Sequence, residues 1–190
     1  MKFVPTKFEN AWLIEPDRHE DERGFFARTW CQREFEERGL TADLVQCSVS
    51  FNKARGTLRG MHFQAAPNEE AKLVRCTQGS IFDVIVDVRR QSPTFGEWQS
   101  FELSSKNRNA LLIPEGFAHG FQTLAPDSEL LYQMSEFFHP ESARAFHFAD
   151  PAVGIDWPLP VAAISEKDQS NSPLDHTRPT IHRAAQATSP

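Results

Sequence analysis

Features that would place a chain in a disulfide, zinc or membrane class are scarce in this sequence. Its 190 residues hold three cysteines and no CxxC pair, whereas disulfide frameworks and zinc sites use paired cysteines at short spacing. We therefore expect Cys31, Cys47 and Cys76 to be reduced, buried thiols of a cytoplasmic protein. The first residues lack the continuous apolar run of a signal peptide. No stretch reaches the roughly 20 apolar residues of a membrane span, so no membrane partner is expected.

Positive charge and tyrosine are scarce as well. The chain has 20 Lys and Arg against 26 Asp and Glu, a net charge of −6. This balance disfavours non-specific nucleic-acid binding but permits an anionic ligand held by local arginines. Phenylalanine occurs 16 times and tyrosine once, so Tyr132 is the only phenol. Hydrophobic residues make up 39%, as in ordinary globular proteins, and the length fits one domain.

The pattern of residues 56–89 predicts three strands, because apolar and polar residues alternate with period two. His62 lies on one face of the first run, and Lys72 shares a face with Val74 and Cys76 in the second. The third run sends Asp83 and Asp87 to the face opposite Phe82, Val84 and Val86. Gln78-Gly79 predicts the tight turn between the last two runs, since glycine adopts positive φ without strain.

Short strands are predicted along most of the remaining chain. They fall within 1–15, 44–51, 97–103, 110–114, 117–121 and 130–134. Residues 31–38 favour a short helix that ends before Gly39, and DERG at 21–24 is read as a turn before Phe25 and Phe26, which we expect to pack. Residues 169–190 are polar without periodicity, so we expect one domain at 1–168 and a tail. Many short strands with one or two helices predict an all-β barrel or jelly roll.

Five polar side chains fall on strand faces that should be core: His62, Lys72, Asp83, His119 and Tyr132. Because burying such groups is costly unless they are paired, they predict a polar pocket inside the barrel. A histidine can remove a proton next to a carbonyl, and a carboxylate behind it fixes its tautomer. A lysine can stabilise the enolate oxygen, and a phenol on the opposite side can return a proton. Such a set would invert a stereocentre without a cofactor.

Two spaced motifs resemble those of the cupin superfamily, a group of double-sheet β-barrels. They are Gly60-x-His62-x-Gln64 and Pro114-x-Gly116-x-x-His119. Metal-binding cupins use a second histidine where this chain has Gln64, a poor ligand for a transition metal. We therefore expect no metal site.

A longer set of motifs, in the same order along the chain, resembles the dTDP-4-dehydrorhamnose 3,5-epimerase family. The stretches are GTLRGMHFQ, AKLVRC, FDVIVDVR, SPTFGEW, IPEGFAHGF, LLYQMSEFFHPES and GIDWP, within about 21–168. The resemblance implies a cupin-like jelly roll and a cofactor-independent enzyme. It also implies inversion of C3 and C5, which flank the C4 ketone of a dTDP-4-keto-6-deoxyhexose, through an enolate. A homodimer with sites completed across subunits is a further implication.

The resemblance assigns roles to residues by position. His62 matches the catalytic base, Asp168 its paired carboxylate, Tyr132 the proton donor and Lys72 the residue near the C4 oxygen. His119 and Asp83 match a second polar pair in the pocket. Arg23 and Arg59 match residues that hold the diphosphate, and Gln46 and Lys167 match contacts to nucleotide or sugar. Segment 21–30 is expected to reach the partner subunit's substrate.

Four positions depart from the family pattern, all on the nucleotide or sugar-rim side. Arg28 and Ser48 replace a glutamate and an asparagine of the binding set, while Ala143 and Phe138 replace a glutamate and a tyrosine. These departures leave the identity of the nucleotide undetermined. They also keep a mono-epimerase of C3 or C5 as an alternative. Two further alternatives are a metal-dependent cupin enzyme and a non-catalytic sugar-nucleotide binder.

Overall fold

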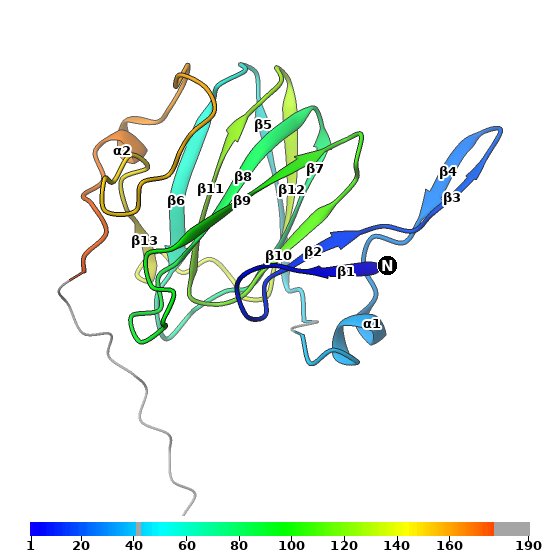
Figure 1. The fold of residues 1–190 in the computed structure, drawn as a ribbon, viewed down its shortest axis with the longest axis horizontal. Helices are drawn as coiled ribbons and strands as arrows, with labels where there is room; N and C mark the ends of the chain where they lie inside the picture. The colour runs from blue at the N-terminus through cyan, green and yellow to red at the C-terminus, as the bar shows by residue number, and fades with distance from the viewer. Residues whose placement is uncertain (41–42, 177–190) are drawn as a thin grey trace, which may run out of the picture.

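Two facing antiparallel sheets form a barrel in the computed structural model, which describes residues 1–40 and 43–176 (Figure 1). One sheet has the order β1 (Lys2–Pro5), β2 (Trp12–Glu15), β10 (Ala110–Ile113), β7 (Lys72–Gln78), β12 (Ser128–Met134), β5 (Gln46–Asn52). The other has the order β13 (Ala143–Ala145), β6 (Leu58–Gln64), β11 (Phe117–Thr123), β8 (Ser80–Asp87), β9 (Trp98–Ser104). A separate hairpin, β3 (Arg18–Asp21) and β4 (Gly24–Ala27), and two short helices, α1 (Gln32–Glu36) and α2 (Glu166–Gln169), complete the described elements. The predicted all-β jelly roll is confirmed.

The core lies between the two sheets and follows the predicted alternation. On β8, Ile81 and Ile85 point inward and join a cluster with Val74, Leu130 and Phe121. Residues Val84 and Val86 of β8 belong to a different cluster, on the outer face of the five-stranded sheet. Period-two patterning therefore sets which face of each strand enters the barrel.

Both outer faces are covered by segments outside the barrel. Around α1, Phe35 and Leu40 pack on Leu73 and Leu112 of the six-stranded sheet. The segment after β13 covers the other sheet, with Phe146 and Val153 in the cluster. Among the described residues, no helix is long and apolar enough to cross a membrane.

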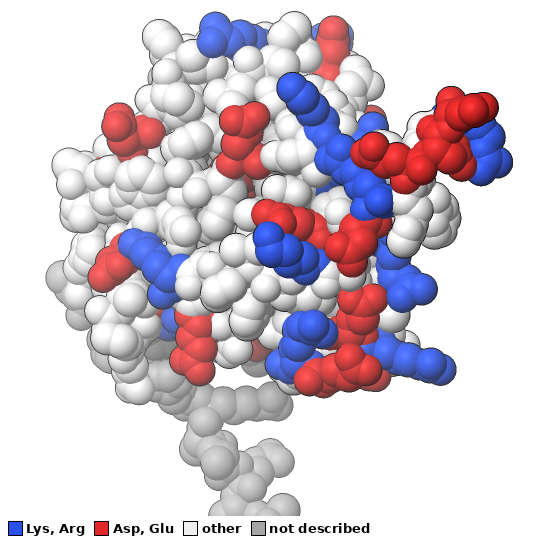
Figure 2. All heavy atoms as spheres, turned by 45° about the vertical axis from the view of Figure 1, so that its right-hand side comes forward, with Lys and Arg blue, Asp and Glu red and all other residues white. Residues whose placement is uncertain are grey.

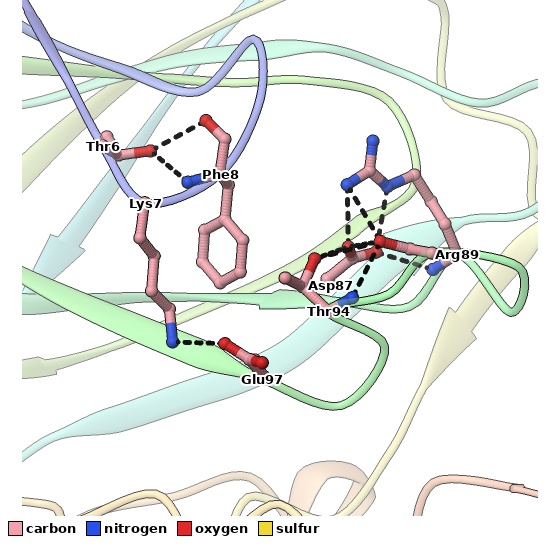
Figure 3. A network of polar contacts seen from close by, with 8 residues as sticks. Thr6, Lys7, Phe8, Asp87, Arg89, Thr94 and Glu97 are labelled. Atoms are coloured by element: carbon pink, nitrogen blue, oxygen red, sulfur yellow. Dashed lines mark hydrogen bonds and ion pairs between the residues drawn. The ribbon is translucent and has the colours of Figure 1, made fainter.

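The turn after β8 is held by the second aspartate of that strand, Asp87. Its buried carboxylate accepts hydrogen bonds from Arg89 Nε at 2.9 Å, from Ser92 Oγ at 2.5 Å and from Thr94 Oγ1 at 2.6 Å (Figure 3). Burial alone would raise the pKa of Asp87, but these bonds hold it below its usual value. Asp87 is therefore satisfied by its own turn and takes no part in the pocket below.

The N-terminal part differs most from the sequence prediction. The turn predicted at 21–24 is confirmed as the turn of the β3–β4 hairpin, whereas the pairing of its two strands was not predicted, and the hairpin projects from the body (Figure 1). Phe26 is 75% exposed, so the expectation that it packs is wrong within the described chain, whereas Phe25, 44% exposed, packs against the Arg18 and Arg108 guanidinium groups. The prediction of buried thiols holds for Cys76 and is wrong for Cys47, which is exposed on the edge strand β5.

Part of the predicted tail runs along the barrel. The Ser172 carbonyl accepts a hydrogen bond from His147 N at 2.9 Å, and Leu174 N donates to Asp150 Oδ2 at 2.6 Å. Residues 177–190 lie outside the described part of the chain. The boundary at residue 168 stays a prediction.

Candidate active site

His62 and Asp168 form a hydrogen-bonded pair at the mouth of the barrel. His62 Nε2 lies 2.6 Å from Asp168 Oδ1, although the two residues are 106 positions apart in the sequence. The His62 side chain is 47% exposed and that of Asp168 6%. The imidazole thus faces open space while the carboxylate behind it is shielded, which is the arrangement of an oriented general base.

The chain brings Asp168 to this position through the start of α2. Leu58 N donates to the Ala163 carbonyl at 2.8 Å, which ties the segment before α2 to the start of β6. Ser165 caps the helix by accepting from Asp168 N at 3.0 Å. Burial alone would raise the pKa of Asp168, but His62, the Gly60 N–H and Ser165 hold that pKa below its usual value. Asp168 is therefore ionised near neutral pH and presents its negative charge to His62 Nε2.

A second pair of the same kind stands next to the first. His119 on β11 is the direct cross-strand partner of His62 on β6. Its Nε2 lies 2.7 Å from Asp83 Oδ1, and the side chains of His119 and Asp83 are 5% and 0% exposed. Burial raises the pKa of Asp83, and the nearby His119 offsets this only in part. In residues 1–40 and 43–176, Asp83 Oδ2 is a buried oxygen without a hydrogen-bond partner.

Two glycines allow β6 and β11 to lie this close. A Cβ on Gly60, which has φ +145°, would lie 2.7 Å from Gly120 Cα. A Cβ on Gly120 would lie 2.4 Å from Met61 Sδ and 2.9 Å from the Arg59 carbonyl oxygen. Only glycine fits at both positions without moving backbone. The register shift between His119 and Phe121 falls at the same place, so that Arg59 and His62 are opposite Phe121 and His119.

The six-stranded sheet supplies the other wall. Tyr132 on β12 meets His119 across the barrel, with ring centroids 5.8 Å apart at 75°. Burial, reinforced by the charge of Asp83, raises the pKa of Tyr132, and Arg59 offsets this only in part. The phenol therefore keeps its proton at neutral pH and can act as an acid. His62 and Tyr132 come from opposite sheets.

Lys72 lies one strand further along the same sheet. It shares the face of Val74 and Cys76, as predicted, and is opposite Met134 on β12. Its ammonium forms an ion pair with Glu70, and the side chain is 12% exposed. Glu70 was not identified from sequence as the partner of Lys72, because a loop glutamate two residues before a strand gives no signal of its direction.

Three predicted binding residues lie on strands next to these side chains. Ser48 and Gln46 on β5 are the cross-strand partners of Tyr132 and Met134, so all four share one face. Arg59 is held by Asn52, with Nε 2.8 Å from Asn52 Oδ1. Sequence reasoning missed Asn52, which is buried at the end of β5.

Other predicted residues lie apart from the pocket. Arg23 is 89% exposed at the tip of the hairpin and pairs with Asp21, and Arg28 is 64% exposed and pairs with Glu34. Figure 2 shows the hairpin standing clear of the body at the upper right, with charges of both signs near its tip. Lys167 is exposed on α2, next to Asp168.

The departures at Phe138 and Ala143 fall on one side of the mouth. Phe138 is 62% exposed, and its N–H donates to Gln46 Oε1 at 3.1 Å. Ala143 on β13 is the cross-strand partner of Gln64. Phe138 is thus tied to β5 and Ala143 to the end of β6.

Gln64 has a structural role. Its amide donates to the Asn68 and Phe137 carbonyls at 3.0 and 3.1 Å, and its oxygen accepts from His139 N at 2.6 Å. These bonds close the end of β6 against the loop after β12. In the described part of the chain, no group of three or more His, Cys, Asp or Glu side chains could hold a metal ion.

Comparison with known proteins gives a consistent result. The profile of the family described as dTDP-4-dehydrorhamnose 3,5-epimerase matches residues 5–176. The Pseudomonas aeruginosa protein of that description is 45% identical over 171 residues, covering 89% of this chain and 93% of its own. The dTDP-6-deoxy-D-glucose-3,5-epimerase of Legionella pneumophila, solved in complex with dTDP-4-keto-L-rhamnose, gives a TM-score of 0.86 at 39% identity, with 91% of this chain and 92% of that chain covered. A 3'-monoepimerase from Streptomyces bikiniensis, in complex with dTDP-quinovose, gives 0.84 at 32% identity, with coverage of 90% and 86%.

Proposed function

The chain belongs to the dTDP-4-dehydrorhamnose 3,5-epimerase family, and we propose that it inverts C3 and C5 of a dTDP-4-keto-6-deoxyhexose. The observation that carries this proposal is the placement of His62, with Asp168 behind it, on one sheet and Tyr132 on the other. Removal of a proton from one face of a carbon and return from the opposite face inverts that carbon. A base and an acid on facing walls are the equipment for this reaction.

The chemistry needs no group beyond these side chains and the substrate's own ketone. Hydrogens on C3 and C5 are acidic because the C4 carbonyl accepts the electron pair as an enolate. His62 takes the proton, and ionised Asp168 stabilises the imidazolium that forms. Lys72 stabilises the enolate oxygen. Tyr132, whose pKa is raised by burial, returns a proton from the other side.

Arg59 and the rim of β5 bind the rest of the substrate in this proposal. The Arg59 guanidinium suits a diphosphate because it offers a planar fork of donors. Gln46 and Ser48 on β5 and His119 on β11 offer further polar groups, and Lys167 is exposed on α2 next to Asp168. Of the positions that depart from the family, Arg28 is exposed and paired with Glu34, whereas Ser48 is the cross-strand partner of Tyr132. In this proposal these departures bear on the nucleotide more than on the reaction.

We also propose that two copies of the chain form a homodimer with sites completed across the subunits. Val49 and Phe51 on the outer face of β5 are 59% and 47% exposed. On the same face Arg75 is 7% exposed, and in the described chain its Nε is buried without a partner. A second copy covering this face would bury the apolar side chains. In such a dimer, Arg23 and Arg28 of one subunit would reach the substrate bound by the other subunit.

The dimer proposal has a direct test. Val49→Asp should shift the sedimentation coefficient from dimer to monomer, whereas Val161→Asp, at a valine that is 38% exposed elsewhere, should leave the dimer intact. A Val49→Asp protein that remains dimeric would exclude this face as the interface. A reducing compartment, and hence a cytoplasmic location, fits the three free thiols.

The 3'-monoepimerase similarity keeps inversion of a single carbon as the second candidate. Incubation of the protein with dTDP-4-keto-6-deoxyglucose in D₂O, followed by NMR, separates the two. Deuterium at both C3 and C5 supports the 3,5-epimerase. Deuterium at one carbon supports the mono-epimerase, and no deuterium at either carbon contradicts both.

A further inference from the structure

We propose that Asp83 and His119 form an internal proton donor that restores Tyr132 between the two inversions of one catalytic cycle. This inference rests on the proposed function, because it concerns an enzyme that inverts two carbons of one bound substrate. It assigns a positioning and proton-supply role to the second histidine–aspartate pair, which the reaction as described above does not use.

The need for such a donor follows from proton counting. Each inversion moves one proton from carbon to His62 and one proton from Tyr132 to carbon. After the first inversion His62 is an imidazolium and Tyr132 is a phenolate, so neither can act again. The two residues differ in access to water, because the His62 side chain is 47% exposed and can lose its proton to solvent. Tyr132 faces the barrel interior, packed against the core cluster, and the bound sugar would cover it.

The Asp83–His119 pair lies beside Tyr132. The His119 ring meets the Tyr132 ring edge-on at 5.8 Å. Asp83 lies close enough for its charge to raise the pKa of Tyr132. Both members of the pair are almost inaccessible to solvent. The pair is therefore placed to exchange a proton with the phenol while the substrate is bound.

The unpaired oxygen of Asp83 supports the same role. A fully buried carboxylate oxygen without a partner in the described chain costs free energy, and such a cost is retained mainly at functional sites. By contrast Asp87, on the same strand face, is satisfied by Arg89, Ser92 and Thr94. Burial raises the pKa of Asp83, so a proton is held more firmly at this carboxyl than at an exposed one, and His119 Nε2 lies 2.7 Å from Asp83 Oδ1, within hydrogen-bond distance.

The proton transfer from the Asp83–His119 pair to Tyr132 balances and is favourable in free energy. The Tyr132 O–H bond breaks as the new C–H bond forms, and the phenolate then takes the proton held by the pair. Asp83 is left as a carboxylate and His119 as a neutral imidazole. Because the ordinary pKa of a phenol is about 10 and those of imidazole and carboxyl are about 6.5 and 4, the phenolate is the stronger base. The pair regains its proton from water after the product leaves.

Asp83→Asn tests the proposal, because the amide keeps the shape of the side chain but cannot hold the proton. The measurement is single-turnover NMR in D₂O with dTDP-4-keto-6-deoxyglucose, following each carbon separately. In the variant the first carbon should exchange within about threefold of the wild-type rate. The second should slow on the order of 10²-fold, so that a singly inverted sugar accumulates.

Asp168→Asn is the matched control, since it makes the same change in the His62–Asp168 pair. It should slow both carbons together, because His62 acts in both steps. His119→Gln should give the same singly inverted product as Asp83→Asn, and it tests the proposal if Asp83→Asn does not fold. The ratio of singly to doubly inverted product is the readout, since a purely structural defect slows both steps alike.

Two outcomes overturn the inference. Equal slowing of both carbons in Asp83→Asn, or a wild-type product ratio, would show that Tyr132 is restored by another route. In either case wild-type protein that inverts both carbons leaves the proposed function intact. Wild-type protein that exchanges no hydrogen overturns the proposed function and this inference together.

Discussion

His62 and His119 are direct cross-strand partners, and each holds a different aspartate through its Nε2 atom. The two pairs are alike in geometry, with Nε2–Oδ1 distances of 2.6 and 2.7 Å, and unlike in environment. His62 is half exposed and its aspartate has a lowered pKa, whereas His119 is buried and its aspartate has a raised pKa. Two pairs of the same residue types are therefore suited to opposite tasks: the His62 pair accepts protons and the His119 pair retains them.

Removal of the carboxylate behind His62 should reduce turnover without weakening binding. Asp168→Asn is expected to lower kcat by about 10²- to 10⁴-fold, because the imidazolium loses its stabilising charge and its fixed tautomer. KM should change little if Arg59 and the polar residues of β5 hold the substrate, as proposed. Steady-state kinetics measure both constants. A large rise in KM with unchanged kcat would contradict the assignment of Asp168 to the base.

Removal of the buried charge at Asp83 should leave the protein at least as stable at neutral pH. Because the folded-state pKa of Asp83 is raised, the folded protein binds more protons than the unfolded chain between the ordinary value near ~4 and the raised one. Wild-type stability therefore falls as pH rises through that window.

Asparagine at position 83 does not titrate. The stability of Asp83→Asn relative to wild type should therefore be greatest at pH values above the raised pKa of Asp83, and the difference should vanish below the ordinary carboxyl value. Thermal unfolding followed by circular dichroism from pH 7 down to 4 measures the difference. A Tm several degrees below wild type at pH 7 would instead indicate that Asp83 and His119 stabilise the fold as an ion pair.

Because β6 and β11 approach closely, Gly120 should not tolerate a larger side chain. Gly120→Ala should destabilise the protein by about 1–3 kcal/mol, because its Cβ would collide with Met61 and with backbone of Arg59 and Gly60. Activity per folded molecule should also fall, since the change displaces His119 from His62. Urea unfolding and kcat on the same samples provide the two values. Gly24→Ala is a useful comparison, because a Cβ there meets nothing within 4 Å although φ is +129°.

If each site takes residues from both subunits, two inactive variants should restore each other's activity in a mixed dimer. Arg23→Ala and His62→Ala proteins should each be inactive at low substrate, whereas mixed and re-annealed samples should regain about a quarter of wild-type activity. Half of the dimers are then mixed, and one of their two sites carries neither change. Failure of the mixture to regain activity would contradict a role for the hairpin in the partner's site.

Much of the barrel could be predicted from sequence because its strands alternate strictly. β8 is an example, with Asp83 inward and Val84 outward as expected from period two. The turn of the β3–β4 hairpin was predicted, but its strands were not, since Arg18–Asp21 has no apolar alternation. Its pairing is supported instead by contacts such as Arg18 to the Lys106 carbonyl, which sequence does not reveal.

Prediction of the site was limited by distance along the chain. Alternation placed His62, Lys72 and Tyr132 on inward faces, which the sheet registers bear out. Asp168 could be named only through family resemblance, because a tie between the start of β6 and Ala163 brings it to His62. The pairing of Lys72 with Glu70 and the contact of Arg59 with Asn52 depend on loop and edge geometry that residue patterns do not encode.

The central claim is that His62 and Tyr132 act on opposite faces of the same carbons. Tyr132→Phe in D₂O tests it most directly, with His62→Ala beside it. The account predicts that Tyr132→Phe exchanges substrate hydrogen for deuterium with retention of configuration, because His62 removes the proton and returns a deuteron to the same face. His62→Ala should show neither exchange nor inversion. Inversion at wild-type rate in Tyr132→Phe, or exchange in His62→Ala, would contradict the account.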